Sequence, residues 1–163
     1  MFPSPFHILI TGASSGIGAA LARAYARPGV FLFLGGRDPV RLGRVAAQCR
    51  DKGAQVEEKQ LDVCAREDMY HWIVDADQRH PLDLVIANAG ISGGTGGDAG
   101  ETGKQARRIF EVNLTGVLNT IHHAVLCMME CGCGLSSSMS WLAYVSCWPG
   151  PPAYSASKGA GRL

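Results

Sequence analysis

The amino-acid sequence predicts an α/β fold in which a doubly wound parallel sheet carries helices on both faces. Short apolar runs alternate along the chain with longer segments whose apolar residues recur at helical spacing. A glycine-rich turn also joins the first apolar run to the first helical segment. With 163 residues, of which 47% are hydrophobic and 18% charged, the chain can bury one core, and we predict a single domain over residues 1–163.

Four strands are predicted from the apolar runs, at residues 7–11, 30–36, 54–63 and 82–90. Runs such as "HILIT" and "VFLFLGG" are nearly continuous in apolar residues, which is typical of parallel strands buried on both faces. Helices are predicted between the strands, at residues 16–27, 39–52 and 65–79. In the first helix, Ile17, Leu21 and Ala24 are spaced to lie on one face.

A longer helix is predicted at residues 103–130, and we expect it to lie against the sheet. Its apolar residues form one stripe, which consists of Phe110, Leu114, Val117, Ile121, Val125 and Met128. The glycine-rich segment 90–103 before it predicts a loop. We interpret this loop as a connector. The alternative is a ligand contact at its start, since ligands in open α/β sheets bind at the carboxyl ends of strands.

Charge and hydropathy exclude several classes of protein. The net charge is +1 and no stripe of lysine and arginine is present, so we expect no nucleic acid as a partner. No segment approaches the roughly 18 consecutive apolar residues that span a bilayer, so we expect no membrane partner. The N-terminus lacks the pattern of a secretory signal, and a cytoplasmic location is the default expectation.

The six cysteines are predicted to be free thiols, because a chain of this length with its own core needs no disulfide framework. Cys127, Cys131 and Cys133 lie close together in the sequence. Their spacing matches no established zinc pattern, and only His122 or His123 could serve as a nearby fourth ligand. We therefore predict no metal site.

The stretch "TGASSGIG", from Thr11 to Gly18, follows an apolar strand and opens a helix, which is the context of a dinucleotide-binding turn. Gly12 allows a tight turn, Gly16 lets the backbone approach a pyrophosphate, and Gly18 lets helix and strand pack closely. The helix N-terminus then faces the anion. The alternative is a plain tight turn. The predicted coenzyme-binding residues of this stretch are Gly12, Ser14, Ser15, Gly16, Ile17 and Gly18.

The spacing Gly-x-x-x-Gly-x-Gly resembles that of the short-chain dehydrogenases/reductases. Three further stretches agree: "NAG" at Asn88 to Gly90, "FEVNLTG" around Asn113, and "YSASK" from Tyr154 to Lys158. The four motifs occur in the family's order and cover essentially the whole chain. The resemblance implies a Rossmann-like fold and an oxidoreductase that transfers a hydride between a nicotinamide cofactor and an alcohol or carbonyl substrate.

Tyr154 and Lys158 are four residues apart and are neighbours on one face if their segment is helical. The ammonium favours the phenolate and lowers the pKa of the tyrosine from about 10 towards the range useful in acid/base chemistry. The resemblance implies that Tyr154 exchanges a proton with the substrate and that Lys158 also holds the nicotinamide ribose. It further implies that Asn113 orders a water molecule in the proton relay. The alternative for the pair is an ordinary surface contact.

The residues after the second strand bear on the choice of coenzyme. An acidic residue about 20 positions beyond the glycine turn favours NAD, whereas a basic residue accepts the phosphate of NADP. The chain reads "GGRDP", so Arg37 comes at this place, and Ser14 adds a hydroxyl donor. We predict NADP, with NAD as the alternative because Asp38 follows directly. Arg37 could also be an ordinary solvated charge.

The resemblance assigns further residues to the coenzyme. Asp62 and Val63 are expected to border the adenine, and Asn88, Ala89 and Gly90 to line the middle of the cofactor.

The segment before Tyr154 departs from the family's pattern. The family usually keeps a serine about thirteen positions before the tyrosine, where it polarises the substrate carbonyl. This chain has Trp141 there, and a bulky indole fills space that a substrate needs. Ser140 and Ser138 would face the opposite side of a strand.

The chain ends at Leu163, soon after the start of the helix that carries Tyr154 and Lys158. We therefore expect a truncated domain whose sheet is incomplete at its C-terminal edge. The predicted function is that of an NAD(P)-dependent oxidoreductase acting on a small alcohol or carbonyl compound. The alternatives are a catalytically impaired dinucleotide-binding module and a non-functional fragment. The resemblance implies a homo-oligomer for full-length members and leaves the question open for this chain.

Overall fold

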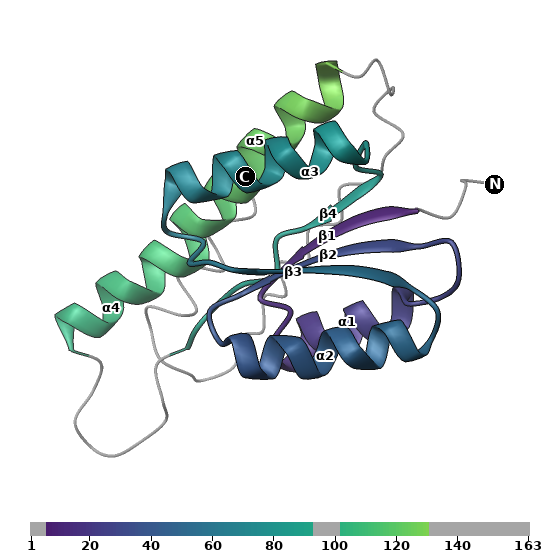
Figure 1. Cartoon of the computed structure of the whole chain (residues 1–163). Helices are drawn as coiled ribbons and strands as arrows, with labels where there is room; N and C mark the ends of the chain where they lie inside the picture. The colour runs from purple at the N-terminus through teal and green to yellow at the C-terminus, as the bar shows by residue number, and fades with distance from the viewer. Residues whose placement is uncertain (1–5, 93–101, 131–163) are drawn as a thin grey trace.

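The computed structural model describes residues 6–92 and 102–130, which form a parallel sheet between two layers of helices (Figure 1). The strands of this part of the chain are β1 (His7–Thr11), β2 (Phe31–Gly36), β3 (Gln55–Gln60) and β4 (Leu84–Ile86). Their order in the sheet is β3-β2-β1-β4, and every neighbouring pair is parallel. The predicted α/β class is confirmed.

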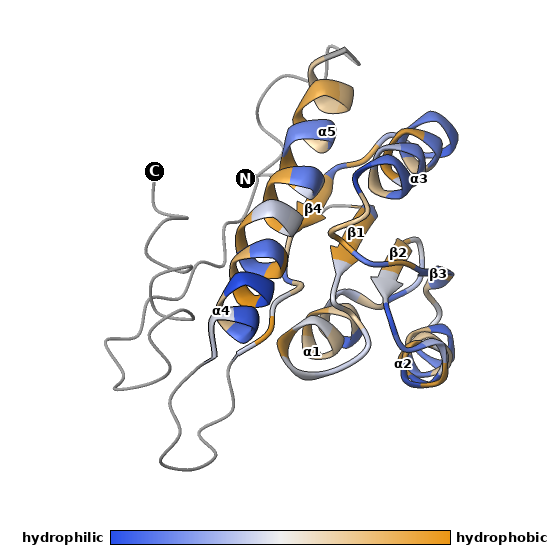
Figure 2. Ribbon diagram, turned by 90° about the vertical axis from the view of Figure 1, so that its left-hand side faces the viewer, coloured by the Kyte–Doolittle hydropathy of each residue, from blue (hydrophilic) through white to orange (hydrophobic). Residues whose placement is uncertain are grey.

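The helices are α1 (Gly16–Tyr25), α2 (Pro39–Asp51), α3 (Arg66–Arg79), α4 (Gly103–Phe110), the π-helical η1 (Glu111–Thr115) and α5 (Gly116–Glu130). α1 and α2 cover one face of the sheet, whereas α3 and α5 cover the other (Figures 1 and 2). The sheet is therefore doubly wound, as predicted.

The core consists of two apolar layers, one on each face of the sheet. Ile8 and Ile10 of β1 join the layer under α1 and α2, whereas Leu9 joins the layer under α3 and α5. All three are fully buried. Because neighbouring side chains of a strand point to opposite faces, a strand covered on both sides must be apolar throughout. Burial of each such side chain stabilises the fold by about 1.5–3 kcal/mol.

β3 lies at the edge of the described sheet and is polar except for Val56, as its sequence "QVEEKQ" shows. Charged residues on an edge strand discourage pairing with another chain. β3 and β4 are shorter than the predicted strands at 54–63 and 82–90. The residues after each strand instead turn away from the ladder and form the loops described below.

The segment 103–130 is helical and lies over one face of the sheet, as predicted, but the predicted apolar stripe is not its most buried face. Phe110, the first residue of the expected apolar stripe, is 37% exposed, and the other five are only partly buried. The residues buried in its place are Ile109, Val112, Asn113, Asn119, Thr120, His123 and Ala124. The buried face is offset by one position from the expected stripe both before the π-helical turn, at Ile109, and after it, at Ala124. This inner face lies close to the loop after β3. It therefore carries a small residue, Gly116, against Val63 and a hydrogen-bonding residue, Asn119, that donates to the Val63 carbonyl oxygen.

Candidate functional site

The three glycines of the turn between β1 and α1 differ in their surroundings. A Cβ atom at Gly12 would lie 2.7 Å from the Cα atom of Ala89, and one at Gly18 would overlap the carbonyl oxygen of Gly12. A Cβ atom at Gly16 would meet nothing within 4 Å. Gly12 and Gly16 have φ angles of +67° and +55°, which L side chains rarely adopt. Gly12 and Gly18 are thus required for packing, whereas the backbone at Gly16 faces open space.

The N-terminus of α1 lies beside this open space. Ser15 is the N-cap, but its side chain makes no capping hydrogen bond, and the first turn carries no acidic residue. Ser15, Gly16 and Ile17 are exposed, and Ser14 is half-buried. Free amide groups and the positive end of the helix dipole suit an anionic group such as a diphosphate.

Thr11 joins the ends of β1 and β4. Its hydroxyl oxygen accepts hydrogen bonds from the backbone N–H groups of Asn88 (3.1 Å) and Ala89 (3.2 Å). The side-chain Nδ2 of Asn88 donates hydrogen bonds to the carbonyl oxygens of Thr11 (3.2 Å) and Gly12 (3.3 Å). The glycine turn and the predicted Asn88–Gly90 segment are therefore held together. No role for Thr11 was predicted from the sequence. A buried hydroxyl at the end of an apolar strand needs a hydrogen-bond partner, and this need was the available signal.

Asn113 lies in the π-helical turn η1 and is 4% exposed. Its Oδ1 accepts a hydrogen bond from the backbone N–H of Ile91 (2.8 Å), and its Nδ2 donates to the Ile91 carbonyl oxygen (2.9 Å). The asparagine therefore ties the helical segment to the chain that leaves β4. π-Helical turns within α-helices often occur at functional sites.

Of the two predicted determinants of the NADP phosphate, Arg37 follows the end of β2 and Ser14 lies beside Gly36, the residue before Arg37. Arg37 is exposed directly after the last residue of β2, and a Cβ atom at Gly36 would lie 3.3 Å from Cβ of Ser14. Asp38 is instead the N-cap of α2. Its Oδ1 accepts from the backbone N–H of Arg41 (2.9 Å) and its Oδ2 from Nε of Arg41 (2.6 Å). Both hydrogen bonds hold the pKa of Asp38 below its ordinary value.

The loop after β3 docks on the helical segment that carries Asn113. Asp62 accepts from the backbone N–H of Cys64 (3.0 Å) and pairs with Nη2 of Arg108 on α4 (2.6 Å). Burial raises the pKa of Asp62, but these hydrogen bonds outweigh it and hold the pKa below its ordinary value. Burial and contact with Asp62 raise the pKa of the Cys64 thiol to about 11, so this thiol stays protonated at neutral pH.

Val63 is buried in the same loop, and its side chain packs against Gly116. Its carbonyl oxygen accepts a hydrogen bond from Nδ2 of Asn119 (2.9 Å). Arg108 and Asn119 were not predicted from the sequence, because their partners lie 46 and 56 positions away.

The predicted residues Tyr154, Lys158 and Trp141 lie outside the described residues, as do Ser138 and Ser140. Cys131 and Cys133 lie outside them as well. Within residues 6–92 and 102–130, no group of three His, Cys, Asp or Glu residues could hold a metal ion. No helix in the same ranges has the length and apolar character needed to cross a membrane.

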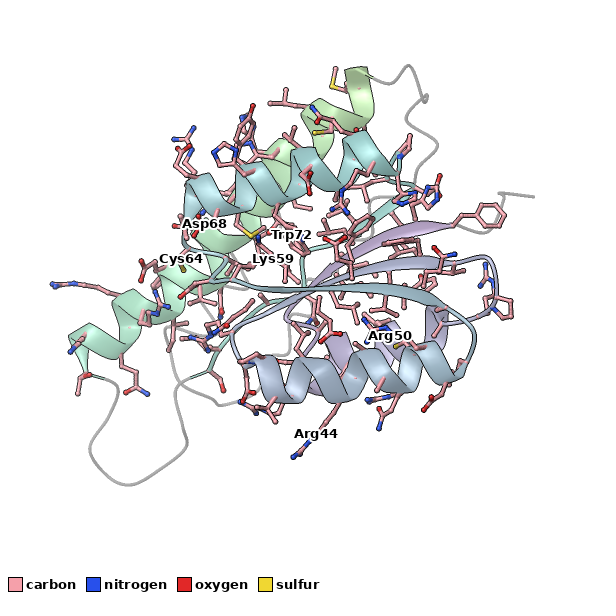
Figure 3. The ribbon with its side chains drawn as sticks, in the orientation of Figure 1. Arg44, Arg50, Lys59, Cys64, Asp68 and Trp72 are labelled. Atoms are coloured by element: carbon pink, nitrogen blue, oxygen red, sulfur yellow. The ribbon has the colours of Figure 1, made fainter. Side chains whose placement is uncertain are left out.

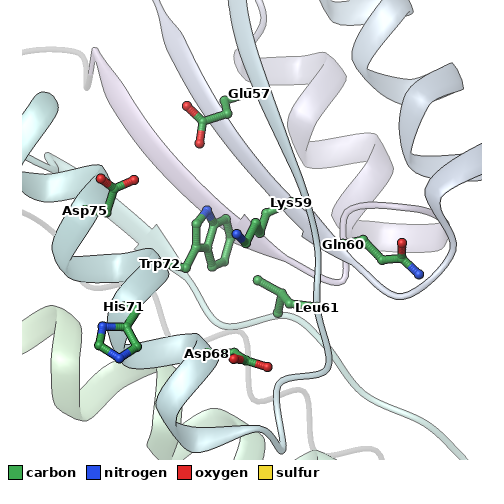
Figure 4. A pocket seen from close by; sticks show the side chains of 8 residues that line it. All are labelled: Glu57, Lys59, Gln60, Leu61, Asp68, His71, Trp72 and Asp75. Atoms are coloured by element: carbon green, nitrogen blue, oxygen red, sulfur yellow. The ribbon is translucent and has the colours of Figure 1, made fainter.

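A hollow of about 410 Å³ lies between β3 and α3, away from the glycine turn (Figures 3 and 4). It is lined by Glu57, Lys59, Gln60, Leu61, Asp68, His71, Trp72 and Asp75. Arg79 pairs with two of its carboxylates, those of Glu57 (2.6 Å) and Asp75 (2.7 Å). The buried Trp72 Nε1 has no hydrogen-bond partner within the described part of the chain. None of the predicted coenzyme residues lines this hollow.

Comparisons with known proteins agree with the fold and identify the family. The family model for short chain dehydrogenases matches residues 6–163. The chain belongs to this family of NAD(P)-dependent oxidoreductases, and its sheet has the Rossmann-like form of the family.

Two similar curated proteins are uncharacterized oxidoreductases. The one from Myxococcus xanthus is 37% identical over 92% of this chain and 59% of its own length. The one from Staphylococcus saprophyticus is 32% identical over 93% of this chain and 65% of its own length. The chain therefore spans less than two thirds of the length of either relative.

Two solved structures show the same arrangement. The alcohol dehydrogenase of the archaeon Thermococcus sibiricus, in complex with 5-hydroxy-NADP, is 29% identical with a TM-score of 0.79 and covers 96% of this chain and 67% of its own. An NAD+-bound xylitol dehydrogenase reaches a TM-score of 0.82 at 24% identity, over 98% of this chain and 61% of its own. The second similarity concerns the fold alone.

Proposed function

We propose that this chain binds NADP at the carboxyl edge of its sheet and forms the coenzyme-binding part of an enzyme that oxidises or reduces a small alcohol or carbonyl compound. The observation that carries the proposal is the open space in front of Gly16, at an uncapped helix N-terminus. A diphosphate group fits there because backbone N–H groups are available and no carboxylate of the first turn repels it.

Four observations support NADP rather than NAD. Arg37 is exposed and directly follows β2, and Ser14 lies beside Gly36. Asp38, the residue that could favour NAD, has both carboxylate oxygens engaged by Arg41. The similar alcohol dehydrogenase of Thermococcus sibiricus is described in complex with an NADP derivative.

When bound, the coenzyme supplies or accepts the hydride. The proposed proton donor and acceptor is the Tyr154 hydroxyl, whose pKa is lowered by the ammonium of Lys158. Lys158 also holds the nicotinamide ribose in this proposal. Asn113 fixes the segment after β4 through its two bonds to Ile91 and orders a water in the proton relay. Asp62 and Val63 border the adenine, and Asn88, Ala89 and Gly90 line the middle of the coenzyme.

The alternative is a coenzyme-binding module without turnover, and Trp141 in place of the family's serine favours it. Because the chain spans less than two thirds of its relatives, the substrate, an assembly of several copies and a cytoplasmic location are proposals for the whole protein.

Titration of the purified chain with NADPH and NADH, followed by the fluorescence of the reduced nicotinamide, tests the proposal. We expect saturable binding that is tighter for NADPH. The absence of saturable binding of either coenzyme would contradict the proposed function. Turnover of a generic aldehyde or ketone separates the enzyme from the binding module, and Trp141→Ser is expected to raise the rate if the tryptophan occupies the serine position.

A further inference from the structure

We propose that Arg41 sets the coenzyme preference of this chain by keeping the Asp38 carboxylate away from the ribose. This inference rests on the proposed function, since it concerns the same coenzyme site. It assigns a positioning role to a residue that has no place in the glycine turn or among the predicted catalytic residues.

Asp38 is the residue that could reverse the preference for NADP. An acidic side chain about 20 residues beyond the glycine turn binds the ribose hydroxyl of NAD and repels the additional phosphate of NADP. Asp38 follows the end of β2 by two positions, next to the exposed Arg37. With one acid and one base in adjacent positions, the preference depends on which side chain is free.

In the structure, the residues after β2 engage the carboxylate of Asp38 and leave the side chain of Arg37 exposed. Each oxygen of the Asp38 carboxylate accepts a hydrogen bond from Arg41, one from the backbone N–H (2.9 Å) and one from Nε (2.6 Å). Pro39, at the start of α2, fixes the turn in which the two residues meet. The guanidinium of Arg37 has no hydrogen-bond or ion-pair partner among the described residues. The charge of Asp38 is therefore neutralised, and the charge of Arg37 is not.

Arg41 can be removed without loss of the fold. The side chains of Arg41 and Asp38 are 60% and 36% exposed, and an exposed pair of this kind contributes little to folding. Without the Arg41 side chain, the Asp38 Oδ1 can still cap α2 through the backbone N–H, whereas its Oδ2 becomes available to a ribose hydroxyl. A neutral side chain at position 41 should thus convert Asp38 into a residue that accepts NAD.

The test compares dissociation constants for NADPH and NADH in four forms of the full chain: wild type, Arg41→Gln, Arg44→Gln and Asp38→Asn/Arg41→Gln. Arg44 is the matched control, because it is exposed on the same helix and points away from the sheet (Figure 3). Its loss removes the same charge without releasing Asp38. Asparagine at position 38 keeps the helix cap and removes the charge.

We expect Arg41→Gln to tighten NADH binding about fivefold, which corresponds to ~1 kcal/mol. We also expect it to weaken NADPH binding, and the gain for NADH should disappear in the double variant. An equal effect of Arg44→Gln, or a gain for NADH that persists in the double variant, would overturn the inference. If wild type binds NADPH and Arg41→Gln leaves the ratio unchanged, the inference fails and the proposed function stands. If no form binds either coenzyme, both fail.

Arg41→Lys provides a second variant that keeps the charge but lacks the Nε–H group. We expect a smaller gain for NADH than with glutamine, since an ammonium still neutralises Asp38. A gain as large as that of Arg41→Gln would contradict the role of charge neutralisation. Circular dichroism at each titration temperature confirms that the variants compared are folded.

Discussion

Gly16 and Gly29 share a backbone conformation but differ in their place in the fold. Their φ angles are +55° and +84°, and a Cβ atom added at either would meet nothing within 4 Å. Gly29 precedes β2 at the opposite end of the sheet from the glycine turn. Substitution of either glycine by alanine should therefore lower the free energy of unfolding by a similar amount, about 1–2 kcal/mol.

If the backbone at Gly16 approaches the coenzyme diphosphate, Gly16→Ala weakens NADPH binding by tenfold or more, on the order of 1.4 kcal/mol. Gly29→Ala is expected to leave the dissociation constant unchanged. Isothermal calorimetry measures both constants, and urea denaturation verifies that the two variants lose similar stability. Equal binding by both variants would show that the open space at Gly16 is not where the diphosphate lies.

Asp62 and Arg108 connect two elements, the loop after β3 and the helix α4. The pKa of Asp62 in the folded chain lies below its ordinary value of 3.8. A carboxylate with a lowered pKa contributes stability at pH values above the ordinary pKa, and this contribution is lost as the pH falls through the folded pKa. Because both side chains are about one third exposed, we expect less than about 1 kcal/mol at pH 7.

Asp62→Asn should therefore lower the free energy of unfolding at pH 7, and its difference from wild type should shrink as the pH falls below about 4. Urea denaturation at several pH values measures this difference. Asp51→Asn serves as the control, since Asp51 is exposed at the end of α2. If the difference in unfolding free energy between wild type and Asp62→Asn is the same at pH 7 and pH 3, ionisation of Asp62 does not contribute to the stability of the fold.

At the scale of the whole molecule, α5 presents apolar side chains to the solvent. Leu118 is 54% exposed, Leu126 47% and Met129 62%. Exposed apolar patches mark association surfaces, and the family resemblance implies an assembly of several copies. We therefore expect the chain to self-associate through α5.

The double variant Leu118→Glu/Leu126→Glu is expected to shift the chain towards monomers in sedimentation equilibrium, because burying two carboxylates is costly. Val40→Glu is the control, since Val40 is 63% exposed on α2. Association that is unchanged in the double variant, or lost equally in the control, would contradict a role for α5.

The fold was largely predictable because it depends on short-range periodicity. "HILIT" is β1 from its first residue to its last, and the glycine turn opens α1 as expected. The buried face of the segment 103–130 was not predictable by apolarity. Gly116, Asn119 and Asn113 face inward because they meet the loops after β3 and β4 at close range. The cap formed by Asp38 and Arg41 is local and could have been predicted from an aspartate before a proline.

The sequence by itself determined the strands, the helices, the glycine turn and the family. Each of these depends on residue types at fixed short spacings, which the geometry of a strand or a helix converts directly into structure. Only the tertiary structure decided that Arg108 meets Asp62, that Asn119 bonds to the carbonyl oxygen of Val63, and that Thr11 joins β1 to β4. Such choices depend on the relative positions of side chains after distant segments have packed, and no local spacing specifies those positions.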